Sequence, residues 1–207
     1  MAQKQLVKPN MLIFWKERLV FLATPKTGST SIETALESLA HVAIQRPPSL
    51  KHMSARKYNR HFAPLLNTDG KARFTTVALM REPIDWLGSW YRYRQRPDIP
   101  NPARSTKALS FDAAAQSYID GAKGGNLAVG SQGKFLGLEQ GRTAVDQVFR
   151  YEAIDQFVHF LEDRLDCEIT LPRLNVSPKA SLELSAKTEA HLRERLADDL
   201  ALYASLA

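Results

Sequence analysis

The stretch that decides the fold occupies residues 19–36 and reads Leu19-Val20-Phe21-Leu22-Ala23-Thr24-Pro25-Lys26-Thr27-Gly28-Ser29-Thr30-Ser31-Ile32-Glu33-Thr34-Ala35-Leu36. Its first five residues are apolar and predict a buried strand. The centre predicts a tight turn, and the spacing of Ile32, Ala35 and Leu36 predicts a helix with one apolar face. We expect Ser29 or Thr30 to cap this helix.

The turn has the composition of an anion-binding loop. The first N–H groups of a helix lack intrahelical partners and lie at the positive end of its dipole, and Lys26 adds a full positive charge. Further donors for phosphate or sulfate oxygens are the hydroxyl groups of Thr27, Ser29, Thr30 and Ser31. We hypothesise that this loop binds the 5′ end of a nucleotide. The alternative is that the hydroxyl residues only cap the helix and that Lys26 is solvated.

The loop is not a Walker A motif. That motif reads G-x-x-x-x-G-K-[ST], whereas Lys26 here precedes Gly28. The order argues against an ordinary ATP or GTP kinase, and leaves an atypical P-loop kinase or a non-catalytic nucleotide- or polyanion-binding module as alternatives.

The composition is that of a globular protein with a preference for anions. The 207 residues are 44% hydrophobic and 24% charged, and they carry a net charge of +6. A positive balance favours nucleotides, acidic glycans or nucleic acid, but no recognised RNA-binding pattern is present, so we expect no nucleic-acid partner. The single cysteine excludes an intrachain disulfide. No apolar run is long enough to span a membrane, and residues 1–10 lack a signal-peptide core, so we expect a cytoplasmic protein.

The rest of the chain alternates between strand and helix patterns. Further strands are predicted at 11–15, 41–45, 74–80 and 145–150, and the runs at 11–15 and 19–23 are compatible with a hairpin that leads into the loop. Helices are predicted at 54 to about 62 or 66, from 83, at 111–119, 153–165 and 188–206. Residues 96–110 and 121–133 are expected to be irregular. Alternation of this kind predicts an α/β fold with a central parallel sheet flanked by helices on both faces, in a single domain spanning residues 1–207. Ligands bind such folds at the carboxyl ends of the strands.

A second phosphate site is predicted where the strand at 74–80 ends. Arg81 follows that strand, and Ser89 lies one turn beyond Asp85 on a helix that begins near Pro83. Arginine suits a phosphate because its planar guanidinium offers a fork of donors. The alternative is that Arg81 pairs with Glu82 or Asp85.

The two segments together resemble the two cofactor motifs of the sulfotransferase family, and residues 25–31 resemble the branch that includes glycan O-sulfotransferases. Weaker similarity extends to Val148–Glu152, Leu174–Pro178 and the segment from Asp199 to Tyr203. The resemblance implies a three-layer, P-loop-like fold. It also implies 3′-phosphoadenosine 5′-phosphosulfate (PAPS) as the sulfuryl donor and adenosine 3′,5′-bisphosphate as the product. The implied acceptor is a hydroxyl group on a small molecule or a glycan.

The same resemblance implies roles for the candidate residues. The 5′-phosphosulfate is bound by Lys26, Thr27, Gly28, Ser29, Thr30 and Ser31, and the 3′-phosphate is bound by Arg81 and Ser89. Lys26 is expected to stabilise the charge that develops on the leaving 5′-phosphate. Because Lys26 and the helix N-terminus already supply positive charge, we expect no metal.

A hydroxyl acceptor needs a base, and His52 is the candidate. It lies where the chain leaves the strand at 41–45 and enters a helix, and histidine suits general-base catalysis near neutral pH. The family pattern implies the same role for His52. His61, Glu33 and Glu37 are the alternative bases. Additional positive charge near the expected site comes from Lys51, Arg56, Arg92, Arg94, Arg96 and Arg104, which we expect to be mostly solvated.

Overall fold

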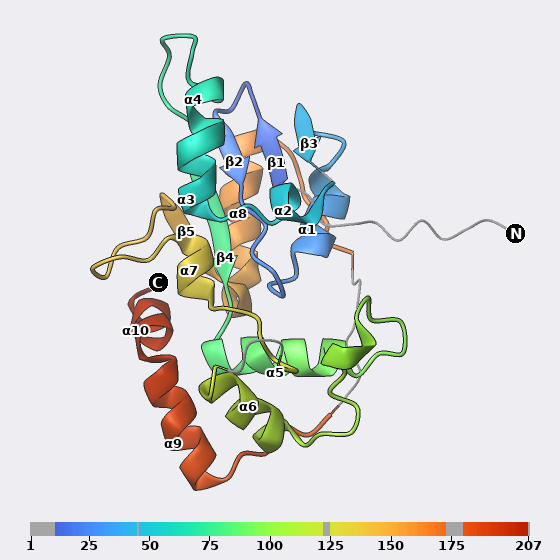
Figure 1. Cartoon of the computed structure of the whole chain (residues 1–207). Helices are drawn as coiled ribbons and strands as arrows, with labels where there is room; N and C mark the ends of the chain where they lie inside the picture. The colour runs from blue at the N-terminus through green and yellow to red at the C-terminus, as the bar shows by residue number, and fades with distance from the viewer. Residues whose placement is uncertain (1–10, 45, 122–124, 173–179, 207) are drawn as a thin grey trace, which may run out of the picture.

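The computed structural model describes residues 11–44, 46–121, 125–172 and 180–206. Its centre is a five-stranded sheet in the order β3-β1-β2-β4-β5 (Figure 1). The strands are β1 (Met11–Phe14), β2 (Leu19–Phe21), β3 (Val42–Ile44), β4 (Thr75–Met80) and β5 (Gln147–Arg150).

The sheet is mixed, which corrects the prediction of a parallel sheet. β2 pairs with β4 and β4 with β5 in parallel, but β1 is antiparallel to both β2 and β3. The reversal follows from the short connection at residues 15–18, because two strands joined so closely can only form a hairpin. The hairpin itself is confirmed, with Ile13 opposite Val20.

Alternation along the strands builds a hydrophobic core on each face of the sheet. On one face Phe14, Phe21 and Leu79 pack against α1 (Ser29–Leu36) and α8 (Ile154–Leu165). On the other face Ile13 and Met80 belong to a core shared with the helices around 55–66, with α7 (Gln132–Leu136) and with α10 (Ala197–Ser205). The sheet is therefore flanked by helices on both faces, as predicted.

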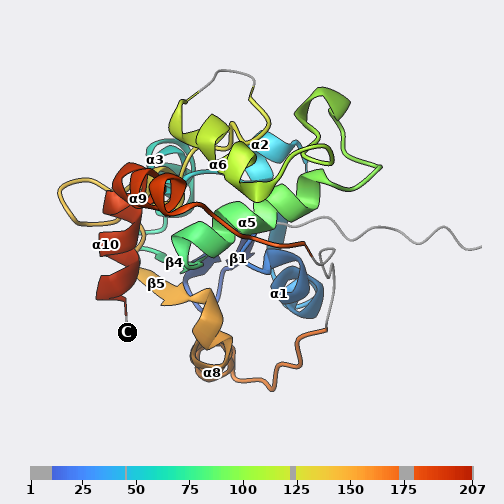
Figure 2. The same cartoon turned by 90° about the horizontal axis from the view of Figure 1, so that it is seen from below.

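A third core lies beyond the carboxyl end of β4. Here α5 (Pro83–Arg94) packs with α6 (Phe111–Ile119) and α9 (Ala186–Arg195) through Trp86, Leu87 and Leu192, among others. Figure 1 shows α5 lying across the lower end of the sheet with α6 and α9 below it, and Figure 2 shows α5 between α6 and the pair α1 and α8. This helix closes the edge at which the candidate site lies.

Several local predictions are confirmed and some are wrong. The predicted helix at 111–119 is present as α6. The predicted helical segment from 54 is also present; it consists of α3 (Ala55–Lys57), a π-helical turn η1 (Tyr58–Phe62) and α4 (Ala63–Leu66). The helix α2 (Pro48–Lys51) and a short 3₁₀ turn η2 (Pro102–Arg104) were not predicted. The predicted terminal helix is interrupted at Leu196, and α7 lies in a stretch expected to be irregular. A second 3₁₀ turn, η3 (Tyr151–Ala153), joins β5 to α8.

Candidate active site

The turn between β2 and α1 has a tight, left-handed geometry. Lys26 and Gly28 have φ angles of 69° and 70°, and the N-cap of α1 is Gly28, with no side-chain cap bond. The prediction that Ser29 or Thr30 caps α1 is therefore wrong. With Gly28 in the left-handed region, the helix begins at Ser29, and the Ser31 N–H donates to the Gly28 carbonyl (3.0 Å).

The packing around residue 28 also leaves no room for a side chain. A Cβ atom on Gly28 would lie 2.7 Å from Cε2 of Tyr151, the first residue of η3. The aromatic ring thus packs directly on the backbone at the start of α1. Both conformation and packing therefore favour glycine at this position.

Four consecutive carbonyl oxygens of the loop accept hydrogen bonds from side chains, and three of the donors come from distant segments. The donors are His52 Nδ1 to Ala23 (2.9 Å), Thr27 Oγ1 to Thr24 (2.9 Å), Trp86 Nε1 to Pro25 (2.9 Å) and Arg81 Nη1 to Lys26 (3.5 Å). These bonds fix the loop and join it to β4, α5 and the segment before α3. Three residues predicted separately from sequence, Lys26, His52 and Arg81, are thereby brought to one site.

The hydroxyl groups of the loop differ in their availability. Thr27 is buried and its hydroxyl is used within the loop, so only its backbone N–H could face a ligand. Ser29 is also buried, whereas Thr30 and Ser31 are half-buried at the start of α1. The anion-binding capacity of the loop therefore lies mainly in its N–H groups and in Lys26.

Lys26 lies among aromatic rings and like charges. Its Nζ is 4.2 Å from the ring centroid of Tyr93 and 5.5 Å from that of Trp90. Burial first, and then the positive charges of Arg96, Arg81 and Arg92, together lower the pKa of Lys26 from 10.5 to about 7. An environment that disfavours the ammonium ion in this way would favour an anion beside it.

Arg81 is held by an acidic partner that it shares with a second arginine. Its Nε lies 2.6 Å from Asp85 Oδ2, and Nη2 of Arg92 lies 3.1 Å from Asp85 Oδ1. The guanidinium of Arg81 also lies 4.9 Å from the ring centroid of Tyr151. The alternative raised from sequence, pairing with Asp85, is therefore seen, and it orders two guanidinium groups side by side.

Ser89 lies on the helix face between these partners. Asp85, Ser89 and Arg92 are spaced by four and three residues on α5, so they share one face, which the Asp85–Arg92 ion pair spans. The Ser89 side chain is buried. Its placement on the same face as the Arg81 partners agrees with the predicted spacing.

The main chain of Arg81 is hydrogen-bonded to a side chain that the sequence analysis did not identify. The side-chain amide of Gln132 accepts from the Arg81 N–H (2.9 Å) and donates to the Arg81 carbonyl (2.8 Å). Gln132 lies in the glycine-rich stretch that was expected to be irregular, and no local pattern marks it.

His52 is oriented as a base would be. A carbonyl oxygen can only accept, so the contact with Ala23 places the proton of neutral His52 on Nδ1 and the lone pair on Nε2. Burial lowers the pKa of His52, the bond to Ala23 opposes that shift, and Lys51 adds to it. The imidazole is therefore neutral near pH 7 and able to accept a proton.

The alternative bases are placed less suitably. Glu33 is fully buried (0% exposed) in the core side of α1, and His61 is exposed on η1. Glu37 is the half-buried residue at the end of α1, far along the helix from its N-terminus. The ring of His52, by contrast, is hydrogen-bonded to the carbonyl of Ala23 in the loop.

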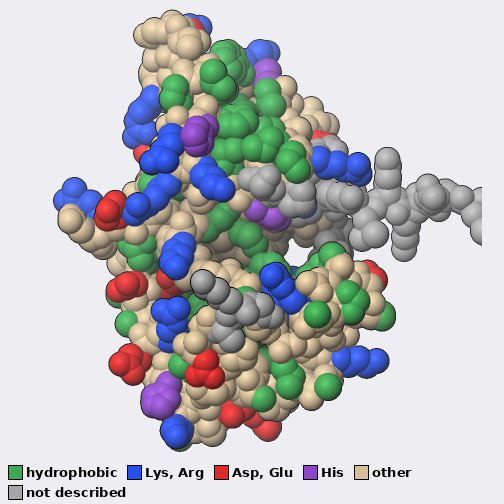
Figure 3. All heavy atoms as spheres, in the orientation of Figure 1, with side chains coloured by type: hydrophobic (Ala, Val, Ile, Leu, Met, Phe, Trp, Pro, Cys, Tyr) green, Lys and Arg blue, Asp and Glu red, His purple; other side chains and the backbone are tan. Residues whose placement is uncertain are grey.

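The basic residues near the site are not all solvated. Lys51 and Arg94 are buried, and Arg94 donates to the carbonyl of Asn126. Arg92, Arg96 and Arg104 are half-buried, so the expectation that most of the six residues are solvated is wrong. Arg56, Lys57 and Lys134 are exposed on α3 and α7, and Figure 3 shows Lys and Arg side chains gathered over these helices. The segment Leu174–Pro178, whose sequence resembles the family, lies outside the described residues.

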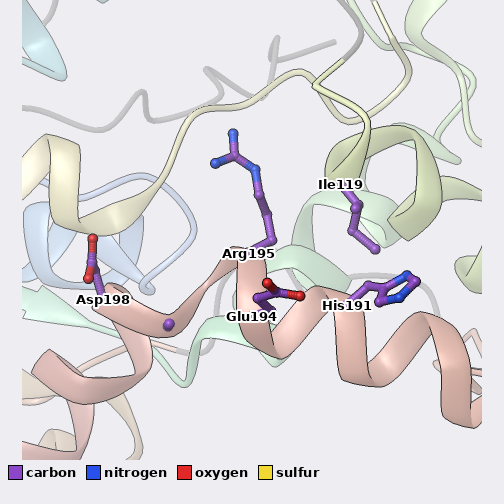
Figure 4. Close-up of a pocket in the computed structure, with 6 residues that line it drawn as sticks. Ile119, His191, Glu194, Arg195 and Asp198 are labelled. Carbon is purple, nitrogen blue, oxygen red and sulfur yellow. The ribbon is translucent and has the colours of Figure 1, made fainter.

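A surface pocket lies elsewhere, between α6 and the C-terminal helices. Its lining includes Ile119 of α6, His191, Glu194 and Arg195 of α9 and Asp198 of α10, and Figure 4 shows Ile119 beside His191 and Asp198 at the opposite end. None of these residues belongs to the predicted site. The candidate site is defined instead by the hydrogen bonds around the loop.

Within the described part of the chain, no group of three or more His, Cys, Asp or Glu side chains is arranged to hold a metal ion. No helix in these same residues has the length and apolar character needed to cross a membrane. Comparisons with protein-family models, with curated proteins and with solved structures found no match for this chain.

Proposed function

We propose that the protein is a PAPS-dependent sulfotransferase that transfers a sulfuryl group to a hydroxyl acceptor. The observation that carries the proposal is the set of side-chain bonds to the loop carbonyls, which joins Lys26, Arg81 and His52 in one site. A loop with N–H donors and a lysine suits a 5′-phosphosulfate, and the arginine pair suits a second phosphate. We also propose that the α/β fold of the chain is P-loop-like.

The reaction would proceed by in-line displacement. The acceptor oxygen forms a bond to sulfur while the bond between sulfur and the bridging oxygen of the 5′-phosphate breaks. The acceptor proton passes to His52 Nε2, whose lone pair is free because Nδ1–H donates to Ala23. Lys26 and the N–H groups at the start of α1 stabilise the negative charge on the departing phosphate.

The state of Lys26 fits this role. In the free protein its pKa is about 7, because burial and neighbouring arginines disfavour the charged form. A bound phosphosulfate adds negative charge beside Nζ and would return the pKa toward the ordinary range. Lys26 would therefore be charged where the leaving group needs it.

The acceptor must carry a hydroxyl group. A small molecule or a glycan with a free hydroxyl would satisfy the chemistry. The exposed basic residues of α3, which follows His52 closely in the chain, favour an acceptor that carries negative charge of its own.

Thermal stabilisation by nucleotides tests the proposal. We expect adenosine 3′,5′-bisphosphate to raise the melting temperature more than ADP or ATP, since the proposed site has separate positions for a 5′- and a 3′-phosphate. A preference for ATP with magnesium would contradict the proposal and favour an atypical kinase.

Turnover separates an enzyme from a binding module. With PAPS and a set of hydroxyl acceptors, His52→Ala should lower the rate by about 10²–10⁴-fold and leave bisphosphate binding unchanged. Unchanged turnover in His52→Ala would remove the base assignment alone. A Lys26→Ala variant that kept full sulfuryl transfer would contradict the mechanism.

A further inference from the structure

The Arg81 backbone lies just beyond the hydrogen-bonded ladder of the sheet. The β4–β5 pairing ends with Met80 opposite Arg150, and β2 is paired with β4 only as far as Val77. A buried N–H and carbonyl at this position need other partners. Gln132 supplies both, so its side-chain amide takes the place of a neighbouring strand.

Gln132 is itself fixed from the far end of the chain. Its own N–H donates to Asp199 Oδ2 (2.9 Å), and the N–H of Gly133 lies 3.2 Å from both Asp199 oxygens. Gln132 is 0% exposed and Asp199 of α10 is 5% exposed. A Cβ atom on Gly133 would lie 2.6 Å from Asp199 Oδ1, so the carboxylate reaches the start of α7 only because residue 133 is glycine.

We propose that Gln132, held by Asp199, is a positioning residue that aligns Arg81 with the 3′-phosphate of the nucleotide. This inference rests on the proposed function, in which Arg81 binds that phosphate. Two hydrogen bonds fix the main chain of Arg81, and Asp85 and Tyr151 then direct its side chain. The network runs from α10 through α7 to the end of β4.

The test compares two ligands that differ only in the 3′-phosphate. Binding of adenosine 3′,5′-bisphosphate and of adenosine 5′-monophosphate is measured by calorimetry, and the ratio of their affinities reports the 3′-phosphate site alone. In Gln132→Met the chain length is kept and both bonds are lost. We expect the ratio to fall by about fivefold or more while the monophosphate affinity stays within about twofold.

A matched control removes a buried hydrogen bond from the opposite end of the same strand. Thr76 lies in β4, and its hydroxyl donates to Asp146 (2.8 Å). Thr76→Val should lower stability as Gln132→Met does, but should leave the affinity ratio unchanged. If the ratio fell equally in the two variants, general loosening of β4 would explain it and the inference would be overturned.

The inference and the proposed function fail in different ways. If the wild-type protein shows no preference for the bisphosphate, the proposed function fails and the inference with it. If the wild type shows the preference and Arg81→Ala abolishes it, but Gln132→Met retains it, only the inference fails. Should Gln132→Met not fold, Asp199→Asn removes one of the two acceptor oxygens. A fall of about twofold in its ratio supports the inference, and an unchanged ratio overturns it.

Discussion

Ligand binding by this protein should take up a proton, and the group responsible is Lys26. Its pKa of about 7 in the free protein reflects burial first and the charges of Arg96, Arg81 and Arg92 second. A bound dianion would favour the ammonium form and return the pKa toward 10.5. The proton must then come from solvent whenever the pH exceeds the free-state pKa.

The size of the effect follows from these two pKa values. At pH 8 about one tenth of free Lys26 is protonated, so Lys26 should take up about 0.9 proton on binding, against about 0.5 at pH 7. The affinity for adenosine 3′,5′-bisphosphate should therefore fall by about fivefold from pH 7 to pH 8 and by about fiftyfold from pH 7 to pH 9.

Calorimetry in buffers of different ionisation enthalpy measures the uptake directly. The observed heat at pH 8 varies linearly with the buffer enthalpy, and the slope is the number of protons bound. In the free protein His52 is neutral at this pH, because burial lowers its pKa. Phosphate groups of the ligand are already fully ionised, since their second pKa is about 6.

Two variants make the assignment specific. Lys26→Met keeps the length of the side chain without a titrating group and should bind weakly with no uptake at pH 8. Lys26→Arg stays protonated throughout and should also show none. Wild-type protein that binds the bisphosphate at pH 8 without taking up a proton would refute the reasoning.

The same shift has the opposite effect on the free protein. The unfolded chain binds the Lys26 proton up to about pH 10.5, whereas the folded chain releases it near pH 7. Stability without ligand should therefore rise between pH 7 and pH 9, while ligand affinity falls. Denaturant melts of the wild type and Lys26→Met separate this contribution from other groups.

Two further predictions concern the surroundings of the loop. Arg96→Gln removes a positive charge near Lys26, so the pKa of Lys26 should rise and the proton uptake at pH 8, measured by the same calorimetry, should become smaller; an unchanged uptake would mean that Arg96 does not act on Lys26. Gly28→Ala should lower the unfolding free energy by about 2 kcal/mol or more, because it adds a clash with Tyr151 to the strain of a positive φ. Gly70→Ala, with a φ of 68° and open space around it, should lose only about 1 kcal/mol, and equal losses in denaturant melts would show that Tyr151 contributes nothing.

Local features of the fold were predictable because they are encoded in short patterns. The apolar run at 74–80 predicted a strand before Arg81, and the proline at position 83 predicted the start of a helix after it. Both elements are present, as β4 and α5. The hairpin of β1 and β2 was predicted, but its consequence, an antiparallel strand within the sheet, was not carried into the prediction of a parallel sheet. Strand direction is set here by the length of the turn, and that signal was available in residues 15–18.

The candidate site was predictable only in part, for a similar reason. Lys26 and Arg81 follow strands directly, so their positions at the sheet edge follow from the chain order. The inward turn of the Thr27 hydroxyl depends on the left-handed backbone of its neighbours, and the role of Gln132 depends on a contact across 51 residues. Neither leaves a periodic pattern in the sequence.

The reversed strand does not displace the site from its predicted edge. β3 and β2 are both antiparallel to β1, so they run in the same direction, and β4 and β5 are parallel to β2. Four of the five strands therefore end at one edge, and the segments that follow them carry His52, Lys26, Arg81 and Tyr151. Because β1 only begins at this edge, its direction changes the pairing of the sheet but not the set of residues that meet there. We therefore expect a ligand to bind at this edge of the mixed sheet, as it would in a parallel one.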